Sequence, residues 1–465
     1  MTEPKPHIQM TRFMPRGSFK AAGTALIAIV LSYLLYSILP FDNDVNKGLS
    51  LLLFVAILWF SEVVHISVTA LMIPIIAVVM GFDGLTTKSA LSNFSDPVIF
   101  IFFGGFALAT ALHMQKLDRK IAFYLVSLAG GNMLVAALLI FAVTAFLSMW
   151  ISNTATAAMM LPLALGVMSH LDRTKHRNSY VFVLLGVAYS ASIGGLGTLV
   201  GSPPNAITAR ELGWGFAEWM KIGIPMTIIL MPVMIATLWF VFRPKFDKSV
   251  GELKDQEAVE WTPIRIVTAL LFLVTALSWI FSSKITALLG TTGTDSLIAM
   301  AAAVLVVVLG CASWKDVVDS TDWGVLLLFG GGITLSSVMQ VSGASQVLGQ
   351  LVADTFTGAN PLLIIFIVCV FIIILTEFTS NTASAALLVP VFAGVATQMG
   401  MPPEVLVVVI GVGASCAFML PVATPPNAIV FGSGLIRQRE MISAGLVLNI
   451  ISIFVISLFV YFFVV

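Results

Sequence analysis

The sequence predicts an all-α polytopic membrane protein with about eleven transmembrane helices and two re-entrant helical hairpins. The composition, the apolar runs and a set of motifs that occurs twice predict this fold. Of the 465 residues, 59% are hydrophobic and 10% charged, and the mean hydropathy is +1.04. Water-soluble domains do not have such values. Runs such as 21–39 and 446–465 are almost continuously apolar, whereas a β-barrel would show short alternating segments.

The apolar runs place the elements along the chain. Segment 1–20 is polar and basic, and the run after it lacks a small-residue cleavage site. It is therefore predicted to be a membrane span (within 21–48) and not a signal peptide. Single spans of the length that a bilayer requires are predicted at 21–40, 49–63, 66–82, 96–113, 179–200, 221–242, 262–281, 295–311, 322–340, 404–422 and 441–465.

Two stretches, 133–168 and 360–398, are too long to be one membrane span. They are also too polar in the middle to be two ordinary spans. Each contains a Ser-Asn-Thr triplet between apolar arms of about 15 residues, a length that falls short of a full crossing. This pattern predicts a hairpin that enters and leaves on one side, with protein or water covering its polar tip.

Basic residues indicate the topology. With a cytoplasmic N-terminus and two hairpins, 18 of the 23 Lys and Arg residues lie in cytoplasmic segments, as the positive-inside rule requires. Counting either hairpin as a full crossing would invert every later loop. The C-terminus is therefore expected outside, and the expected location is the bacterial inner membrane.

Three motifs occur twice in the same order. Phe-Gly-Gly begins at residues 103 and 329, Ser-Asn-Thr at 152 and 380, and Pro-Pro-Asn-Ala-Ile at 203 and 425. The offsets of 226, 228 and 222 residues indicate a duplicated unit, covering 49–242 and 262–465 with a cytoplasmic linker at 243–261. The predicted topology makes the two copies opposite in orientation, which is typical of secondary transporters.

Each repeat pairs a hairpin with a span that glycine and proline must break, at 179–212 and 404–436. A helix N-terminus offers free N–H groups to an anion, and a helix C-terminus offers carbonyls to a cation. The two hairpins and the Gly/Pro-rich breaks, 197–205 and 420–427, contain no Lys or Arg, which favours anion binding together with a cation. Plain helix capping is the alternative for an isolated Ser-Asn-Thr triplet.

Oxygen ligands without paired carboxylates suit a monovalent cation better than calcium or magnesium. Ser148 and Thr376 each precede a triplet by four residues, so sodium is the predicted cation. Glu377 is the one acid beside a tip, and a proton-carrying role is the alternative there, although Met149 takes its place in the other repeat. Nothing indicates an enzyme or a nucleic-acid partner, and Cys311, Cys369 and Cys416 have no expected disulfide, metal or redox role.

With these motifs the sequence resembles the divalent anion/sodium symporter family, which includes bacterial sodium-dependent dicarboxylate transporters. The resemblance implies a homodimer in the lipid bilayer, with scaffold and transport domains and an elevator-type mechanism, and about two or more co-transported sodium ions. It implies a first sodium site at Ser148, Ser152, Asn153 and Gly201, a second at Thr376, Thr379, Asn381 and Ala423, and substrate contacts at Asn153, Thr154, Ser202, Pro203, Asn381, Thr382, Thr424 and Pro425.

The expected function is sodium-coupled symport of C4-dicarboxylates such as succinate, malate and fumarate. Sodium-independent dicarboxylate exchange and symport of citrate or sulfate remain alternatives, because the motifs do not separate them. A passive anion channel is a further alternative, which would need no coupled ion.

Overall fold

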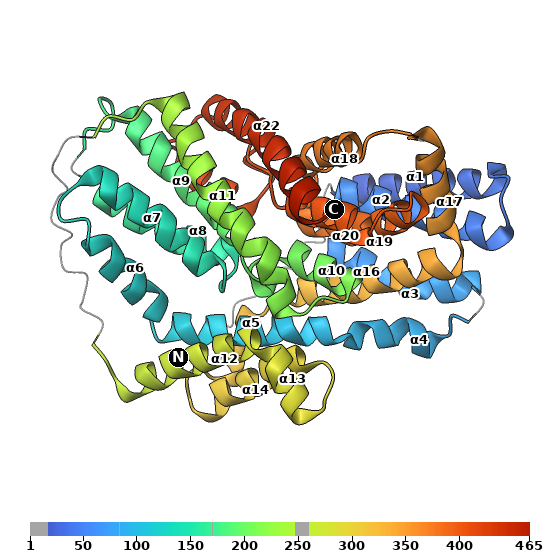
Figure 1. The fold of residues 1–465 in the computed structure, drawn as a ribbon, viewed down its shortest axis with the longest axis horizontal. Helices are drawn as coiled ribbons and strands as arrows, with labels where there is room; N and C mark the ends of the chain where they lie inside the picture. The colour runs from blue at the N-terminus through green and yellow to red at the C-terminus, as the bar shows by residue number, and fades with distance from the viewer. Residues whose placement is uncertain (1–16, 83, 170, 247–259, 357) are drawn as a thin grey trace, which may run out of the picture.

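The computed structural model describes residues 17–82, 84–169, 171–246, 260–356 and 358–465. Most of the predicted N-terminal segment 1–20 and of the linker 243–261 lies outside the described residues. Within them, all regular structure is helical, which confirms the predicted all-α class. Figure 1 shows the arrangement of the helices.

The helices follow the two repeats. After α1 (Gly17–Ile38), the first repeat contains α2 (Asn43–Ser61), α3 (Ile66–Met80), α4 (Thr87–Ser92), α5 (Pro97–Met114), α6 (Leu117–Ser127), α7 (Met133–Ser148), α8 (Asn153–Val167), α9 (Arg177–Gly194), α10 (Pro203–Leu212) and α11 (Phe216–Phe242). The second contains α12 (Pro263–Ile280), α13 (Ser282–Leu289), α14 (Thr294–Val308), α15 (Trp314–Ser320), α16 (Trp323–Val341), α17 (Ala344–Thr355), α18 (Pro361–Thr376), α19 (Asn381–Gln398), α20 (Pro403–Ala414), α21 (Pro425–Gly432) and α22 (Gln438–Phe463).

Local sequence explains where these helices begin. Proline stands in the first turn of α5, α10, α12, α18, α20 and α21, where its missing N–H costs no helical hydrogen bond. Side chains cap other starts: Asn132 accepts from the backbone N–H groups of Leu134 and Val135 at the start of α7, and Asn360 accepts from Leu362 N–H at the start of α18.

The exterior of the molecule is apolar. Leu26, Val79 and Phe240 are 61%, 81% and 75% exposed, which suits a surface that faces lipid tails. Among the described helices, six are long and apolar enough to cross a bilayer, and seven shorter apolar ones accompany them. The number of crossings and the re-entrant course of the hairpins stay predictions.

The helices divide into two packing groups, which touch where α16 packs against α19. In the first group, α3 packs against α16 and α5 against α14. In the second, α7 packs against α9, α18 against α22, and α19 against α20. The two repeats interlock within the second group, because α10 packs on α19 and α20 while α21 packs on α8 and α9.

Each repeat contributes one broken helix to the second group. Residues 195–202 separate α9 from α10, and residues 415–424 separate α20 from α21. The first break lies directly against the tip between α7 and α8, since a Cβ atom on Gly201 would lie 3.0 Å from the Ser148 carbonyl oxygen. Tyr189 Oη of α9 donates to the Phe418 carbonyl at 2.6 Å, which ties the helix before the first break to the second break.

Candidate functional site

Both hairpin tips and both breaks line one cavity of about 1130 Å³. Its wall includes all eight residues predicted to contact substrate: Asn153, Thr154, Ser202, Pro203, Asn381, Thr382, Thr424 and Pro425. The fold therefore brings together residues that lie up to 272 positions apart in the sequence. Their roles in binding stay predictions.

The first tip is a helix start beside a cluster of oxygens. Ser152 Oγ caps α8 by accepting from Ala155 N–H at 3.3 Å, and Asn153 is the first residue of the helix. Ser148 Oγ lies 2.6 Å from Asn153 Oδ1 and donates to the Ala191 carbonyl at 2.7 Å. The predicted first sodium ligands Ser148, Asn153 and Gly201 thus meet here, with Ala191 as an addition that the sequence did not indicate.

The Asn153 amide suits this cluster in two orientations. With its nitrogen turned inward, it donates to Ser148 Oγ at 2.6 Å, to the Ala191 carbonyl at 3.0 Å and to the Gly201 carbonyl at 3.2 Å. With its oxygen turned inward, four oxygens from four chain positions face one another. Such a neutral, oxygen-only set has the chemistry that a hard monovalent cation requires.

The second tip repeats this geometry. Thr376 Oγ1 lies 2.7 Å from Asn381 Oδ1 and donates to the Ala414 carbonyl at 2.7 Å. Ala191 and Ala414 both lie in the last turn of the helix before a break, and the Ala191 carbonyl also accepts from Gly195 N–H at 3.1 Å. The same hydroxyl, amide and carbonyl arrangement therefore occurs at both tips.

Two predicted second-site residues are placed differently. The Thr379 hydroxyl bonds to the Leu375 carbonyl at 2.9 Å and to Ser384 Oγ at 2.7 Å, so its hydrogen bonds lie within the hairpin. Ala423 lines the cavity and is 8% exposed. Of the four residues, Thr376 and Asn381 are thus the pair that the structure brings into direct contact.

Two buried asparagines hold the breaks in shape. Asn205 Nδ2 donates to the Gly195 and Thr198 carbonyls, both at 2.7 Å. Asn427 Nδ2 donates to the Ala417 and Leu420 carbonyls at 3.1 and 3.0 Å. Both side chains are fully buried. Sequence reasoning did not assign them to the site, although their place at the end of the repeated Pro-Pro-Asn motif was the available signal.

Glu377 ties the second tip to its break. Its carboxylate accepts from the backbone N–H groups of Phe418, Met419 and Leu420 at 2.7, 2.9 and 3.1 Å, and from Asn449 Nδ2 at 2.6 Å. An ionised carboxylate can accept all four, whereas a protonated one carries a hydrogen that needs an acceptor. This arrangement favours a fixed structural anion over a proton carrier.

The corresponding contact in the first repeat uses different chemistry. The Thr198 hydroxyl donates to the carbonyl of Met149, the residue that matches Glu377. Both tips are therefore fastened to their breaks at the same position, through a hydroxyl in one repeat and through a carboxylate in the other.

The described residues that line the cavity include no Lys or Arg. Glu62, His113, Asp118 and Asp322 are the ionisable ones, and each lies at or next to the end of a helix. His113 Nδ1 lies 2.9 Å from Asp118 Oδ2. The described residues also contain no group of three His, Cys, Asp or Glu side chains that could hold a metal ion.

Comparisons with known proteins identify the family. A family model described as the sodium:sulfate symporter transmembrane region matches residues 20–464. An uncharacterized transporter from Haemophilus influenzae is 54% identical over 446 residues, covering 94% of this chain and 96% of that protein. The sodium-dependent dicarboxylate transporter SdcS from Staphylococcus saprophyticus is 33% identical over 487 residues, covering 94% and 91%.

Solved structures share the fold at low identity. The YdaH transporter from Alcanivorax borkumensis matches with a TM-score of 0.56 and 14% identity, covering 96% of this chain and 98% of that one. MtrF from Neisseria gonorrhoeae, described as one of a class of antimetabolite efflux pumps, matches with a TM-score of 0.54 and 12% identity, covering 97% and 95%. Because the family model spans nearly the whole chain, this protein belongs to the sodium:sulfate symporter family, whose members are multi-pass, sodium-coupled transporters of the dicarboxylate or sulfate type and not enzymes.

Proposed function

We propose that this protein carries C4-dicarboxylates such as succinate, malate and fumarate across the bacterial inner membrane in symport with sodium. One observation carries the proposal: two matched sets of hydroxyl, amide and carbonyl oxygens stand beside two helix starts in one cavity. The described lining residues include no Lys or Arg. An anion there must be held by neutral donors and by cations bound with it.

The helix starts supply the donors for the anion. The first N–H groups of α8 and α19 have no helical partner, and the helix dipole adds positive potential at each tip. Asn153 and Thr154 lie at one start and Asn381 and Thr382 at the other, and all four line the cavity. Two separate donor sets fit an anion with a carboxylate at each end better than a compact tetrahedral anion.

The oxygen sets are the proposed sodium sites, one for each tip, so about two or more ions accompany each substrate. The Asn153 amide donates to the oxygens of its own set in one orientation and adds a ligand in the other. An incoming sodium ion would thus select the second orientation. Ser152, Thr379 and Ala423 complete the proposed ligand sets, the first for the Asn153 site and the other two for the Asn381 site.

The proposed mechanism is of the elevator type. The second packing group, with both hairpins and both broken helices, is the proposed transport domain, and the first group is the proposed scaffold of a homodimer. The hairpins would re-enter the bilayer from opposite sides, with the N-terminus in the cytoplasm and the C-terminus outside. Two sodium ions would offset the charge of a divalent anion, whose burial alone costs many kcal/mol.

The relative named as a sodium-dependent dicarboxylate transporter supports the substrate class. Sulfate is the second candidate, because the matching family model is described by sodium and sulfate. Sodium-independent exchange of dicarboxylates is the third, and it would use the same helix starts without the oxygen sets.

Uptake by the purified protein in proteoliposomes tests the proposal. Labelled succinate should accumulate against its gradient when sodium is outside and choline inside, and excess sulfate should compete weakly. A matched experiment replaces external sodium with choline and preloads the vesicles with succinate. Uptake that requires the preloaded succinate and does not require sodium would identify an exchanger. Concentrative uptake of sulfate alone would replace the dicarboxylate assignment.

A further inference from the structure

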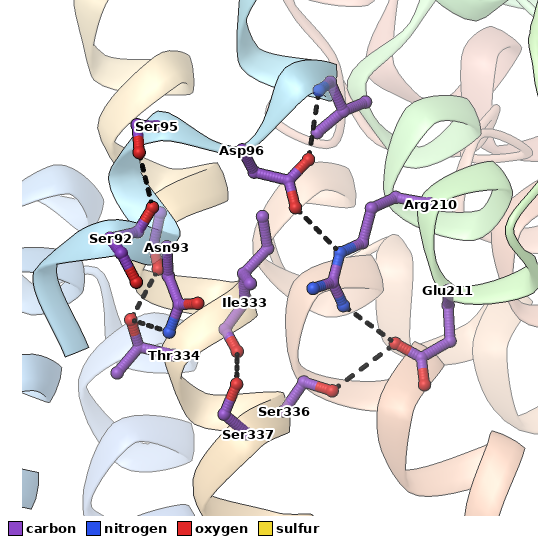
Figure 2. A network of polar contacts seen from close by, with 12 residues as sticks. Ser92, Asn93, Ser95, Asp96, Arg210, Glu211, Ile333, Thr334, Ser336 and Ser337 are labelled. Carbon is purple, nitrogen blue, oxygen red and sulfur yellow. Dashed lines mark hydrogen bonds and ion pairs between the residues drawn. The ribbon is translucent and has the colours of Figure 1, made fainter. Parts of the chain in front are cut away.

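A network of polar contacts joins the two packing groups at a place that the proposed function does not use (Figure 2). Arg210 on α10 donates from Nε to Asp96 Oδ2 at 3.3 Å, and Asp96 precedes α5. Arg210 Nη1 lies 3.7 Å from Glu211 Oε2, and Ser336 on α16 donates to that oxygen at 3.4 Å. We call Asp96, Arg210, Glu211 and Ser336 the clasp.

The clasp and the cavity mouth lie at opposite ends of the same helices. Asp96 stands before the first residue of α5, whereas His113, at its last turn, lines the cavity. Ser336 lies in the last third of α16, whereas Asp322, before its first residue, lines the cavity. A helix of 18 residues is about 27 Å long, so the clasp lies about a helix length away from the exposed helix ends, His113 and Asp322, that line the cavity mouth.

An apolar cluster supports the clasp. Val98, Ile99 and Phe102 of α5, Ala206 of α10, and Leu326, Phe329 and Ile333 of α16 form a buried cluster separate from the main core. The rings of Phe102 and Phe329 lie 5.0 Å apart. Since α10 otherwise packs on α19 and α20 of the second group, this cluster and the clasp are its attachment to the first group.

The burial and geometry of the clasp suit a reversible contact. The side chains of Arg210, Asp96 and Glu211 are 30%, 19% and 11% exposed. Pairs with this much solvent contact contribute little net stability, but separating them leaves charges that need water. The two carboxylate oxygens of Asp96 have different partners. Oδ1 caps α5 by accepting from Val98 N–H at 3.0 Å, and Oδ2 faces Arg210.

We propose that the clasp is a lock on the side opposite the cavity mouth, closed in the conformation described here and broken when the binding site turns to that side. The proposal rests on the alternating access of the proposed function, because a transport domain that slides must carry α10 away from α5 and α16. Arg210 and Asp96 then set how often the site opens on the clasp side.

Labelling of an introduced cysteine tests the lock without any substrate. Val422 is 84% exposed in the cavity, and the three native cysteines are buried. In spheroplasts that express full-length Val422→Cys protein, an impermeant thiol reagent added on the clasp side reacts when the site opens there. Asp96→Asn keeps a residue that caps helices well and removes the charge, and Arg210→Gln removes its partner.

Each substitution should raise the labelling rate about two- to fivefold, the range for a partly buried ion pair that shifts a two-state equilibrium. The double variant should be labelled at the same rate as either single variant, because each single substitution already breaks the ion pair. Lys221→Gln removes an exposed positive charge outside the clasp and should leave the rate unchanged.

Labelling at the parental rate in both single variants would overturn the lock, and so would effects that add in the double variant. Thermal unfolding of the purified variants shows whether they remain folded. Because labelling needs no dicarboxylate, a negative uptake result would reject the proposed substrate and leave the lock to be judged by labelling alone.

Discussion

At the scale of single residues, matching positions in the two repeats carry matching contacts. Ser148 and Thr376 each lie one turn before a triplet, within 2.7 Å of an asparagine amide oxygen and of a carbonyl at a helix end. Plain capping requires only the serine that follows, and Ser152 and Ser380 already perform it. The asparagines are therefore available for ion and substrate.

Asn153→Ala and Asn381→Ala should each lower succinate uptake about 10- to 100-fold, because each removes an amide whose buried partners would stay unsatisfied. Uptake by purified protein in proteoliposomes measures the loss. Asn132→Ala is the matched control, since it removes a capping amide at the start of α7 and should lower only stability. Full activity of either tip variant would show that the Ser-Asn-Thr triplets only cap their helices.

Asn205→Asp and Asn427→Asp should raise the sodium concentration for half-maximal uptake about tenfold. Aspartate keeps the shape but donates no hydrogen bond, so two carbonyls of each break lose their partner. Asn178→Asp serves as the control because Asn178 Nδ2 donates to the Phe242 carbonyl, away from the cavity. An unchanged sodium dependence in both break variants would show that the breaks hold their shape without these amides.

At the scale of elements, close helix contacts hold each hairpin against its broken helix. A Cβ atom on Gly194 of α9 would collide with the backbone of Ala145 in α7, and backbone cannot move aside as a flexible side chain does. Gly166 in α8 has open space around it. Substituting alanine at each of the two glycines therefore separates the effect of close packing from the effect of helix propensity.

Gly194→Ala should lower the free energy of unfolding by about 1–3 kcal/mol, the usual cost of overpacking. Gly166→Ala should be neutral or slightly stabilising, because alanine is the better helix former. Thermal unfolding of the two purified variants in detergent makes the comparison. Equal melting temperatures would mean that α7 and α9 can move apart without loss of stability.

At the scale of the whole molecule, the two tips and the two breaks line one cavity, so ligands that bind there can affect one another. If sodium and the divalent anion share the cavity, linkage requires each to tighten the binding of the other by the same factor. Succinate affinity should therefore rise steeply with sodium. Ser148→Ala and Thr376→Ala should shift this dependence more than the maximal rate at saturating sodium.

Calorimetric titration of succinate across a sodium series measures this coupling. The same titration with potassium or choline at equal ionic strength is the control. Ionic screening would weaken the attraction between succinate and the protein in the same way for every cation. A dissociation constant that stays flat from sodium-free to saturating buffer would contradict charge compensation by sodium, whatever the transport rate.

The sequence by itself determined the all-α membrane class, the duplicated motifs and the residues of the two tips. These features are local, since composition selects the bilayer, apolar runs select helices, and a triplet repeated at nearly constant offset marks equivalent places in two copies. The eight predicted substrate contacts belong to or adjoin the repeated Ser-Asn-Thr and Pro-Pro-Asn motifs at the starts of α8, α10, α19 and α21, and all of them line one cavity.

Only the tertiary structure decided which backbone groups and distant charges join these motifs. The Ala191 and Ala414 carbonyls face the tips because α9 and α20 end there, and any residue type supplies a carbonyl. Asp96 and Arg210 lie 114 positions apart and belong to no repeated motif. Their contact arises from packing between helices, which depends on three-dimensional shape and leaves no local pattern in the chain.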